Sequence, residues 1–247
     1  MIKQRIAIFG VLDSLAGRLV ELLNRLDKYE ICLFISARNI PKLDVQFEHS
    51  VRPHGRTEFP VGHSIFGKEI FAGDDYIQKL HKSQIESCFI LEDDQVLRSQ
   101  ITETLNKAGV KTLSYIDPST VLGGKNQLGP GTIIFPNCYL GYKTDTEVGS
   151  MIQSGSLIEH HSVVGNFVNI NPRLTTGGFV KIEDFAQINI AVDISNRIVI
   201  GRQSIIGAGS LVLENCDSQS LYYGRPAVLV RKLGSLPRLQ NNNSLKD

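Results

Sequence analysis

Hydrophobic residues follow two different periods along the chain, and the period changes near residue 113. Before that point, short apolar runs alternate with segments in which apolar residues recur every three or four positions. The predicted strands are RIAIFG, YEICLFIS, IESCFIL and VKTLSYI, the predicted helices are SLAGRLVELLNRL and DQVLRSQITETLNKAG, and residues 68–83 give strand, turn and helix. This alternation predicts an α/β domain over residues 1–112, a small Rossmann-like parallel sheet with crossover helices.

The ends of the predicted elements add two expectations. Asp94 suits the N-cap of the last helix, and Gly109 suits its C-cap. Parallel sheets of this kind bind ligands at the carboxyl ends of their strands. We therefore expect a ligand-binding site around residues 10–17, 36–38 and 92–94, which include Gly10, Asp13 and Ser36. GVLDSLAG lacks the GxGxxG spacing of a dinucleotide fingerprint.

From residue 116 onward the apolar period is six. Stepping by six from Ile116 to Val212 meets Ile, Leu or Val at fifteen of seventeen positions. Four positions after each of these lies a mostly small or apolar residue, such as Cys138, Ser156 or Cys216, and glycine often follows the aliphatic residue directly. We expect these glycines to supply the turns, because glycine adopts unusual backbone angles without steric cost.

A strand and a corner in every six residues describe a triangular solenoid in which three hexapeptides make one coil. We predict this all-β parallel β-helix over residues 113–217, followed by a C-terminal extension over 218–247. The aliphatic residues point inward, and Cys138 and Cys216 are expected to serve packing rather than chemistry.

Positions eighteen residues apart stack on neighbouring coils. His160 therefore lies at an outward corner between Tyr142 and Gly178. Two interpretations stay open for His160, a solvated corner or a chemical site, since a glycine lets a ligand approach a backbone N–H closely. Asn171 and Asn189 are also one coil apart, and their predicted amide ladder suits stability and ligand binding equally.

The segment LIEHHSVVGNFVNINPRLTTGGFVKI resembles the motif IEH[DE]..IG.F.HI.P...L.G...IG, and LYYGRPAVLVRKL resembles the closing G.PAK..R. Both belong to the hexapeptide-repeat sugar acyltransferases that join an N-terminal α/β domain to a left-handed parallel β-helix. That group contains sialic acid O-acetyltransferases and bacillosamine and perosamine N-acetyltransferases. The left-handed sense comes from this resemblance, because the general rule for crossovers favours the right-handed one.

The resemblance implies an enzyme that transfers an acetyl group from acetyl-CoA to an amine or hydroxyl of a sugar or nucleotide-sugar. His160 would be the general base and Gly178 would offer its N–H to the thioester oxygen. CoA would lie between subunits of a homotrimer, near positions that match Ile190, Gly207, Ala208, Arg225 and Lys232.

Two residues depart from the family motif: His161 stands where an acidic residue usually follows the histidine, and Asn169 stands where F.HI.P has a histidine. Glu159, which matches the motif, directly precedes His160. We treat all three as candidates for orienting or supporting His160. The resemblance also implies that Gly10, Asp13 and Ser36 belong to the acceptor-binding site. The family's glycine-rich G.GGHG stretch, which commonly holds the nucleotide, is GVLDSLAG here, and residues 40–64 resemble an insertion beside it. Two alternatives therefore remain, an acyltransferase on a non-sugar acceptor and a non-catalytic trimeric scaffold or sugar-binding relative.

The composition of the chain disfavours several classes of binding partner. Lys and Arg number 26 against 25 Asp and Glu, which disfavours nucleic acid and acidic membranes as partners. No apolar run is long enough to span a bilayer, and four scattered cysteines fit reduced thiols in a cytoplasmic protein. The spacing of His49, His54 and His63 matches no zinc pattern, so we expect a surface loop and no metal.

Overall fold

The computed structural model describes residues 3–11, 13–37 and 64–234. The chain divides into two units, which we treat separately. The first contains Met1–Glu92 and Ile101–Leu113, and the second contains Asp93–Gln100 and Ser114–Asp247. The first turns of helix α4 therefore belong with the repeats.

The first unit is built on a six-stranded sheet with the strand order β3-β4-β2-β1-β5-β6. All its pairings are parallel except that of β3 with β4. The strands are β1 Gln4–Phe9, β2 Tyr29–Ser36, β3 Ser64–Ile65, β4 Lys68–Ala72, β5 Ser87–Ile90 and β6 Lys111–Thr112, and the helices are α1 Asp13–Leu26, α3 Tyr76–Lys82 and α4 Gln95–Lys107. The predicted Rossmann-like parallel sheet is confirmed.

Both predicted caps of α4 are confirmed. The Asp94 Oδ1 atom accepts the N–H groups of Val96 and Leu97, each at 3.0 Å. Gly109 has a φ of +72°, and the Val110 N–H donates to the Leu105 carbonyl at 2.9 Å. These contacts satisfy backbone groups that every helix end leaves unpaired.

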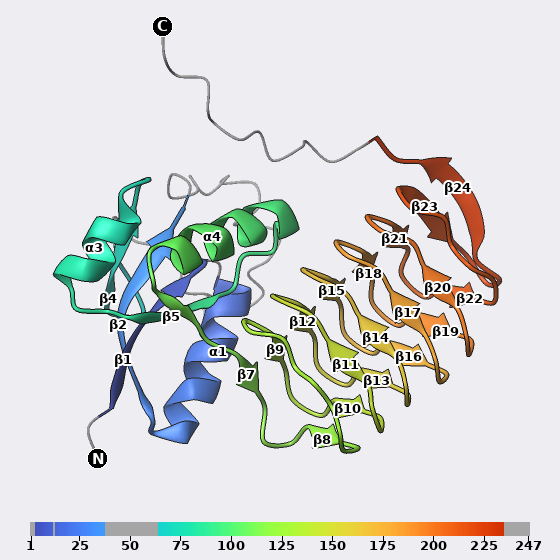
Figure 1. The fold of residues 1–247 in the computed structure, drawn as a ribbon, viewed down its shortest axis with the longest axis horizontal. Coiled ribbons are helices and arrows are strands. Elements are labelled where there is room, and N and C mark those ends of the chain that lie inside the picture. Colours follow the sequence, from blue (N-terminus) through green and yellow to red (C-terminus); the bar gives the residue numbers. More distant parts are fainter. Residues whose placement is uncertain (1–2, 12, 38–63, 235–247) are drawn as a thin grey trace, which may run out of the picture. The chain divides into compact units, whose positions relative to one another are not determined.

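The second unit is a parallel β-helix with three sheets (Figure 1). Each strand pairs with the strand one coil further on, so that residue i lies beside residue i+18, as in Tyr139↔Leu157 and Met151↔Asn169. The first sheet contains β8 Val121–Leu122, β10 Tyr139–Leu140, β13 Leu157–Ile158, β16 Thr175–Thr176, β19 Asp193–Ile194 and β22 Leu211–Val212. The second contains β11 Asp145–Thr146, β14 Val163–Val164, β17 Lys181–Ile182 and β20 Val199–Ile200.

The third sheet ends in a hairpin from the C-terminal segment. It contains β7 Tyr115–Ile116, β9 Ile133–Ile134, β12 Met151–Ile152, β15 Asn169–Ile170, β18 Gln187–Ile188, β21 Ile205–Ile206, β23 Ser220–Tyr223 and β24 Val228–Lys232. Strand β23 continues the coil pairing in parallel with β21, and β24 turns back antiparallel to β23. Residues after 217 thus close one end of this sheet.

The inward aliphatic register forms the core of the solenoid, as predicted. From Ile134 to Val212 its side chains are at most 4% exposed. Ile116 and Leu122 are exceptions at 37% and 41%, because they lie on the first strands of their sheets, where no earlier coil covers them. The second register is buried as well, and Cys138 and Cys216 pack in the core.

The corners turn at a position that the sequence interpretation missed. A residue with positive φ recurs every six positions from Lys125 to Gly209, and His161, Phe167 and Phe179 are among them. The glycine directly after the aliphatic residue has no positive φ, so our expectation for its role was wrong. It avoids a clash instead, because a Cβ on Gly141 would lie 2.5 Å from the backbone nitrogen of His160 on the next coil.

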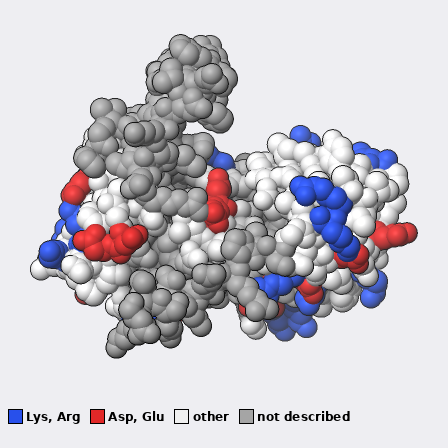
Figure 2. All heavy atoms as spheres, turned by 90° about the horizontal axis from the view of Figure 1, so that it is seen from above, with Lys and Arg blue, Asp and Glu red and all other residues white. Residues whose placement is uncertain are grey.

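The surface carries both signs of charge. On the face drawn in Figure 2, Lys and Arg lie beside Asp and Glu, and neither sign dominates. Within the described ranges, no helix is both long and apolar enough to cross a membrane.

Candidate active site

The two adjacent histidines occupy one corner of the solenoid, directly after strand β13. His160 and His161 are both exposed, as predicted for a corner. The His160 N–H donates to the Glu159 Oε2 atom at 3.2 Å. The Glu159 carboxylate therefore binds the backbone of the corner.

Gly178 lies against the imidazole of His160 on the next coil. A Cβ built on Gly178 would be 2.6 Å from Cε1 and 2.8 Å from Nε2 of that ring. The Gly178 N–H makes no hydrogen bond with any residue that the structure describes. The backbone N–H groups of Tyr142 and Asn196, at the same register and within the described residues, also have no hydrogen-bond partner. Gly178 therefore differs from them in its missing Cβ, which leaves the backbone open to a ligand.

His161 contacts the other side of His160. The two Nδ1 atoms are 3.1 Å apart, which is hydrogen-bonding distance. His161 has a φ of +56°, and its ring stacks on Phe179 of the next coil with a centroid distance of 4.9 Å and an interplanar angle of 13°.

Cations and aromatic rings extend this corner along the solenoid. The Arg197 guanidinium lies 4.7 Å from the centroid of Phe179. The Tyr142 ring meets His161 edge-on at 5.8 Å and has the ammonium groups of Lys125 and Lys143 within 5.9 Å of its centroid. We call these residues, with the two histidines, the corner column: Lys125, Tyr142, Lys143, His160, His161, Phe179 and Arg197.

Asn169 lies on a different sheet from the strand that leads to His160. Its Oδ1 accepts from the Arg98 guanidinium at 2.7 Å, and its Nδ2 donates to the Asp93 carbonyl at 2.8 Å. Arg98 is 1% exposed and also donates to the carbonyls of Gly149 and Phe167. Burial raises the pKa of the Asp93 carboxyl, and the nearby Arg98 charge opposes that rise.

Sequence reasoning missed Arg98. The signal was present, because Arg98, Ile101 and Leu105 share one face of the helix at positions i, i+3 and i+7. An arginine in a buried helical stripe needs acceptors for its N–H groups.

The residues expected near CoA lie toward the last coils. Ile190 and Ala208 are one coil apart and exposed, whereas Gly207 is covered by the Tyr223 ring. Arg225 pairs with Asp193 at 2.9 Å, and Lys232 pairs with Asp217 at 2.7 Å. Both cations thus already have carboxylate partners, although their side chains remain exposed.

Two of the three residues expected to bind the acceptor come together at the carboxyl edge of the first sheet. The Gly10 N–H donates to the Ile35 carbonyl at 3.0 Å, which places Gly10 beside Ser36 at the end of β2. Asp13 begins helix α1.

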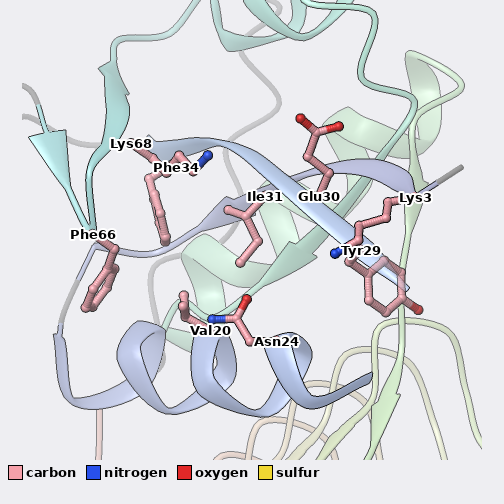
Figure 3. A pocket seen from close by; sticks show the side chains of 9 residues that line it. All are labelled: Lys3, Val20, Asn24, Tyr29, Glu30, Ile31, Phe34, Phe66 and Lys68. Atoms are coloured by element: carbon pink, nitrogen blue, oxygen red, sulfur yellow. The ribbon is translucent and has the colours of Figure 1, made fainter. Parts of the chain in front are cut away.

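A pocket of about 250 Å³ lies elsewhere in this unit, between α1 and β2 (Figure 3). Val20 and Asn24 of α1 and Ile31 and Phe34 of β2 line it, together with Lys3, Tyr29, Glu30, Phe66 and Lys68. Neither Gly10 nor Ser36 lines this pocket.

Part of the chain can be compared with the expectation that the protein holds no metal. Among residues 3–11, 13–37 and 64–234, no three His, Cys, Asp or Glu side chains gather as a metal site. His49, His54 and His63 lie outside the described residues.

The chain is similar in sequence to known acetyltransferases, although no protein-family model matches it. The GDP-perosamine N-acetyltransferase of Escherichia coli O157:H7 is 25% identical over 151 residues, which are 60% of this chain and 66% of that relative. Serine acetyltransferase 2 of Arabidopsis thaliana is 36% identical over 86 residues, 32% of this chain and 27% of that relative. The chain thus spans less than two thirds of the length of these curated relatives.

Solved structures match over nearly the whole chain. PerB from Caulobacter crescentus, in complex with CoA and GDP-perosamine, has a TM-score of 0.77 at 18% identity and covers 93% of this chain and 98% of its own. The acetyltransferase domain of PglB from Neisseria gonorrhoeae FA1090, in complex with acetyl coenzyme A, has a TM-score of 0.76 at 16% identity, with coverage of 93% and 100%. The chain therefore has the fold of the family that its sequence resembles, the hexapeptide-repeat sugar acyltransferases with an N-terminal α/β domain and a left-handed parallel β-helix.

Proposed function

We propose that this protein transfers an acetyl group from acetyl-CoA to an amine or hydroxyl of a sugar or nucleotide-sugar. One observation carries the proposal, the imidazole of His160 packed against the bare Cα of Gly178. A base and a backbone N–H donor at one point are what acyl transfer from a thioester needs.

The reaction is a direct transfer. The Nε2 atom of His160 takes a proton from the acceptor as its nitrogen or oxygen attacks the thioester carbonyl carbon. The Gly178 N–H stabilises the negative charge that develops on the carbonyl oxygen. The tetrahedral intermediate then expels the sulfur of CoA, and the imidazolium returns the proton to that thiolate, so the base ends neutral.

The acceptor proposal rests on the relatives. GDP-perosamine is named for the Escherichia coli enzyme and is bound in the Caulobacter structure, which favours a nucleotide-linked amino-sugar. We propose that Gly10, Asp13 and Ser36 contribute to acceptor binding, because Gly10 and Ser36 lie at strand ends of a parallel sheet and Asp13 begins the helix that follows β1.

CoA binding and assembly are proposed together. Ile190, Gly207 and Ala208 lie on the coils that the family uses for CoA, and Arg225 and Lys232 would have to exchange their carboxylates for its phosphates. We propose a homotrimer with the sites between subunits. We also propose a cytoplasmic location, where acetyl-CoA is available and the four thiols, all in the described part of the chain and all free, stay reduced.

The test records free thiol release from acetyl-CoA with a panel of GDP- and UDP-linked amino-sugars, free amino-sugars and sugar hydroxyl acceptors. We expect His160→Ala to lower kcat at least about 100-fold, the usual contribution of a general base. The exposed His81 of α3 provides the matched control, and His81→Ala should retain full activity.

The outcomes separate the alternatives. Thiol release that continues at the wild-type rate in His160→Ala would refute the mechanism. Turnover of only non-sugar amines would replace the acceptor class, and absence of both acetyl-CoA binding and turnover would establish the scaffold alternative. Light scattering that gives a monomer would contradict the shared site.

A further inference from the structure

We propose that His161 is a positioning residue, a neutral hydrogen-bond acceptor that holds His160 in the tautomer with its proton on Nδ1. The proposal rests on the proposed function, because it concerns the same base. It replaces the expected carboxylate partner with an uncharged ring.

The distance between the rings limits the arrangements. With 3.1 Å between the two Nδ1 atoms, one atom must carry a hydrogen and the other must accept it. If His161 donates, neutral His160 carries its own proton on Nε2 and no lone pair faces the acceptor. If His160 donates, its Nε2 atom keeps a free lone pair, and this nitrogen is among the ring atoms nearest to Gly178. Only the second arrangement gives a base.

The neighbours of His161 fix the ring that accepts this hydrogen bond. Phe179 stacks on it nearly in parallel, and Tyr142 approaches it edge-on at 5.8 Å. Its backbone has a positive φ, which histidine adopts more readily than most residues with a Cβ. The fold thus holds the Nδ1 atom of His161 toward His160 from two sides.

A neutral partner has a different effect from a carboxylate. It orients the imidazole but does not balance the charge that His160 gains when it takes the proton.

The repeats themselves supply matched variants. Phe167, Phe179 and Phe185 occupy the equivalent positive-φ position in other hexapeptides, so His161→Phe keeps a ring on Phe179 and removes the acceptor. His161→Asn keeps an acceptor oxygen and tolerates a positive φ.

The experiment measures kcat by thiol release and the His160 tautomer by ¹⁵N NMR of the imidazole nitrogens at a pH where both rings are neutral. In the wild type we expect the proton on Nδ1 of His160. In His161→Phe we expect it to move to Nε2, with kcat lowered about 10- to 100-fold, as is usual when the partner of a functional histidine is lost. His161→Asn should restore the Nδ1–H tautomer and keep kcat within about 5-fold of wild type.

Two results would overturn the proposal: a wild-type His160 that carries its proton on Nε2, or a His161→Phe variant with unchanged tautomer and kcat. The NMR measurement needs no substrate, so it decides the tautomer even if the chain transfers no acetyl group. Loss of activity in His161→Phe with the tautomer unchanged would make His161 a merely structural residue.

Discussion

At Gly178, the addition of one methyl group should affect catalysis much more than the stability of the fold. Its backbone lies outside the left-handed region, and its register neighbours Tyr142, His160 and Asn196 all carry a Cβ. Alanine is therefore compatible with the backbone. The three heavy atoms nearest to the added Cβ all belong to the imidazole at the far end of His160.

We expect Gly178→Ala to displace the imidazole with little cost in stability. The free energy of unfolding should change by less than about 1 kcal/mol, while kcat falls at least about 10-fold because the base leaves the thioester. Thermal unfolding and thiol release measure the two effects on one sample. Gly177→Ala is the control, because its Cβ would lie 2.7 Å from the backbone nitrogen of Asn196 and should destabilise the fold. Wild-type kcat in a folded Gly178→Ala protein would contradict the site.

The sequence allowed His160 and Gly178 to be predicted as neighbours, because a repeat of eighteen residues fixes which residues stack. The partner of His160 could not be predicted in the same way. Its identity depends on the positive φ of His161 and on where two rings point, and periodicity encodes neither.

At the scale of elements, the first turns of α4 are fastened to the repeats by a buried arginine. Arg98 donates to the Gly149 and Phe167 carbonyls and to Asn169, and Gln95 donates to the Phe167 and Ala186 carbonyls. These bonds join a helix to backbone on neighbouring coils. Asn169 stands where the family motif has a histidine, and its amide completes this attachment by bonding at both ends.

We expect Arg98→Met to lower the free energy of unfolding by about 3 kcal/mol, because the Gly149 carbonyl and the Asn169 Oδ1 atom lose the donor that Arg98 provides. Urea unfolding followed by circular dichroism measures the loss. Arg231→Met, at an exposed position of β24, is the control and should stay within about 0.5 kcal/mol of wild type. An equal effect of both substitutions would show that Arg98 has no special role.

The helices and the longer strands were predictable, since their apolar periods and caps are local signals. VKTLSYI, predicted as one strand, instead forms β6 and β7, which belong to different sheets. The corners of the solenoid were not. Its strands have two residues each, so no strand periodicity can develop, and the residue that turns the chain has no fixed chemical type.

At the scale of the whole molecule, each unit buries thiols that resist ionisation. Burial raises the pKa of Cys88 in the first unit to about 12 and that of Cys216 in the second unit to about 12, from an ordinary value of 9.0. Burial also raises the pKa of Cys138. In the unfolded chain these thiols lose their protons at lower pH than in the folded protein.

Stability should therefore be complete below pH 9 and decline as the pH rises from 9 toward 12. Each of the two thiols should remove about 1.4 kcal/mol from the free energy of unfolding at about pH 10 relative to about pH 8. Urea unfolding at both pH values measures the difference. Cys216→Ala should reduce that difference by the contribution of one thiol, about 1.4 kcal/mol. Cys32→Ala, at a partly exposed position, is the control and should leave the difference unchanged. The same pH dependence in Cys216→Ala as in the wild type would refute the assignment.

The side chain at the positive-φ corner position can change without disturbing the sheets or the core of the solenoid. The sheets are held by backbone hydrogen bonds and by the inward register, and neither uses the side chains at positions such as 143, 161, 179 and 197. Lysine, histidine, phenylalanine and arginine occur there in successive coils. A histidine can thus replace an acid beside the base at almost no cost to folding, and new chemistry can be introduced one coil at a time.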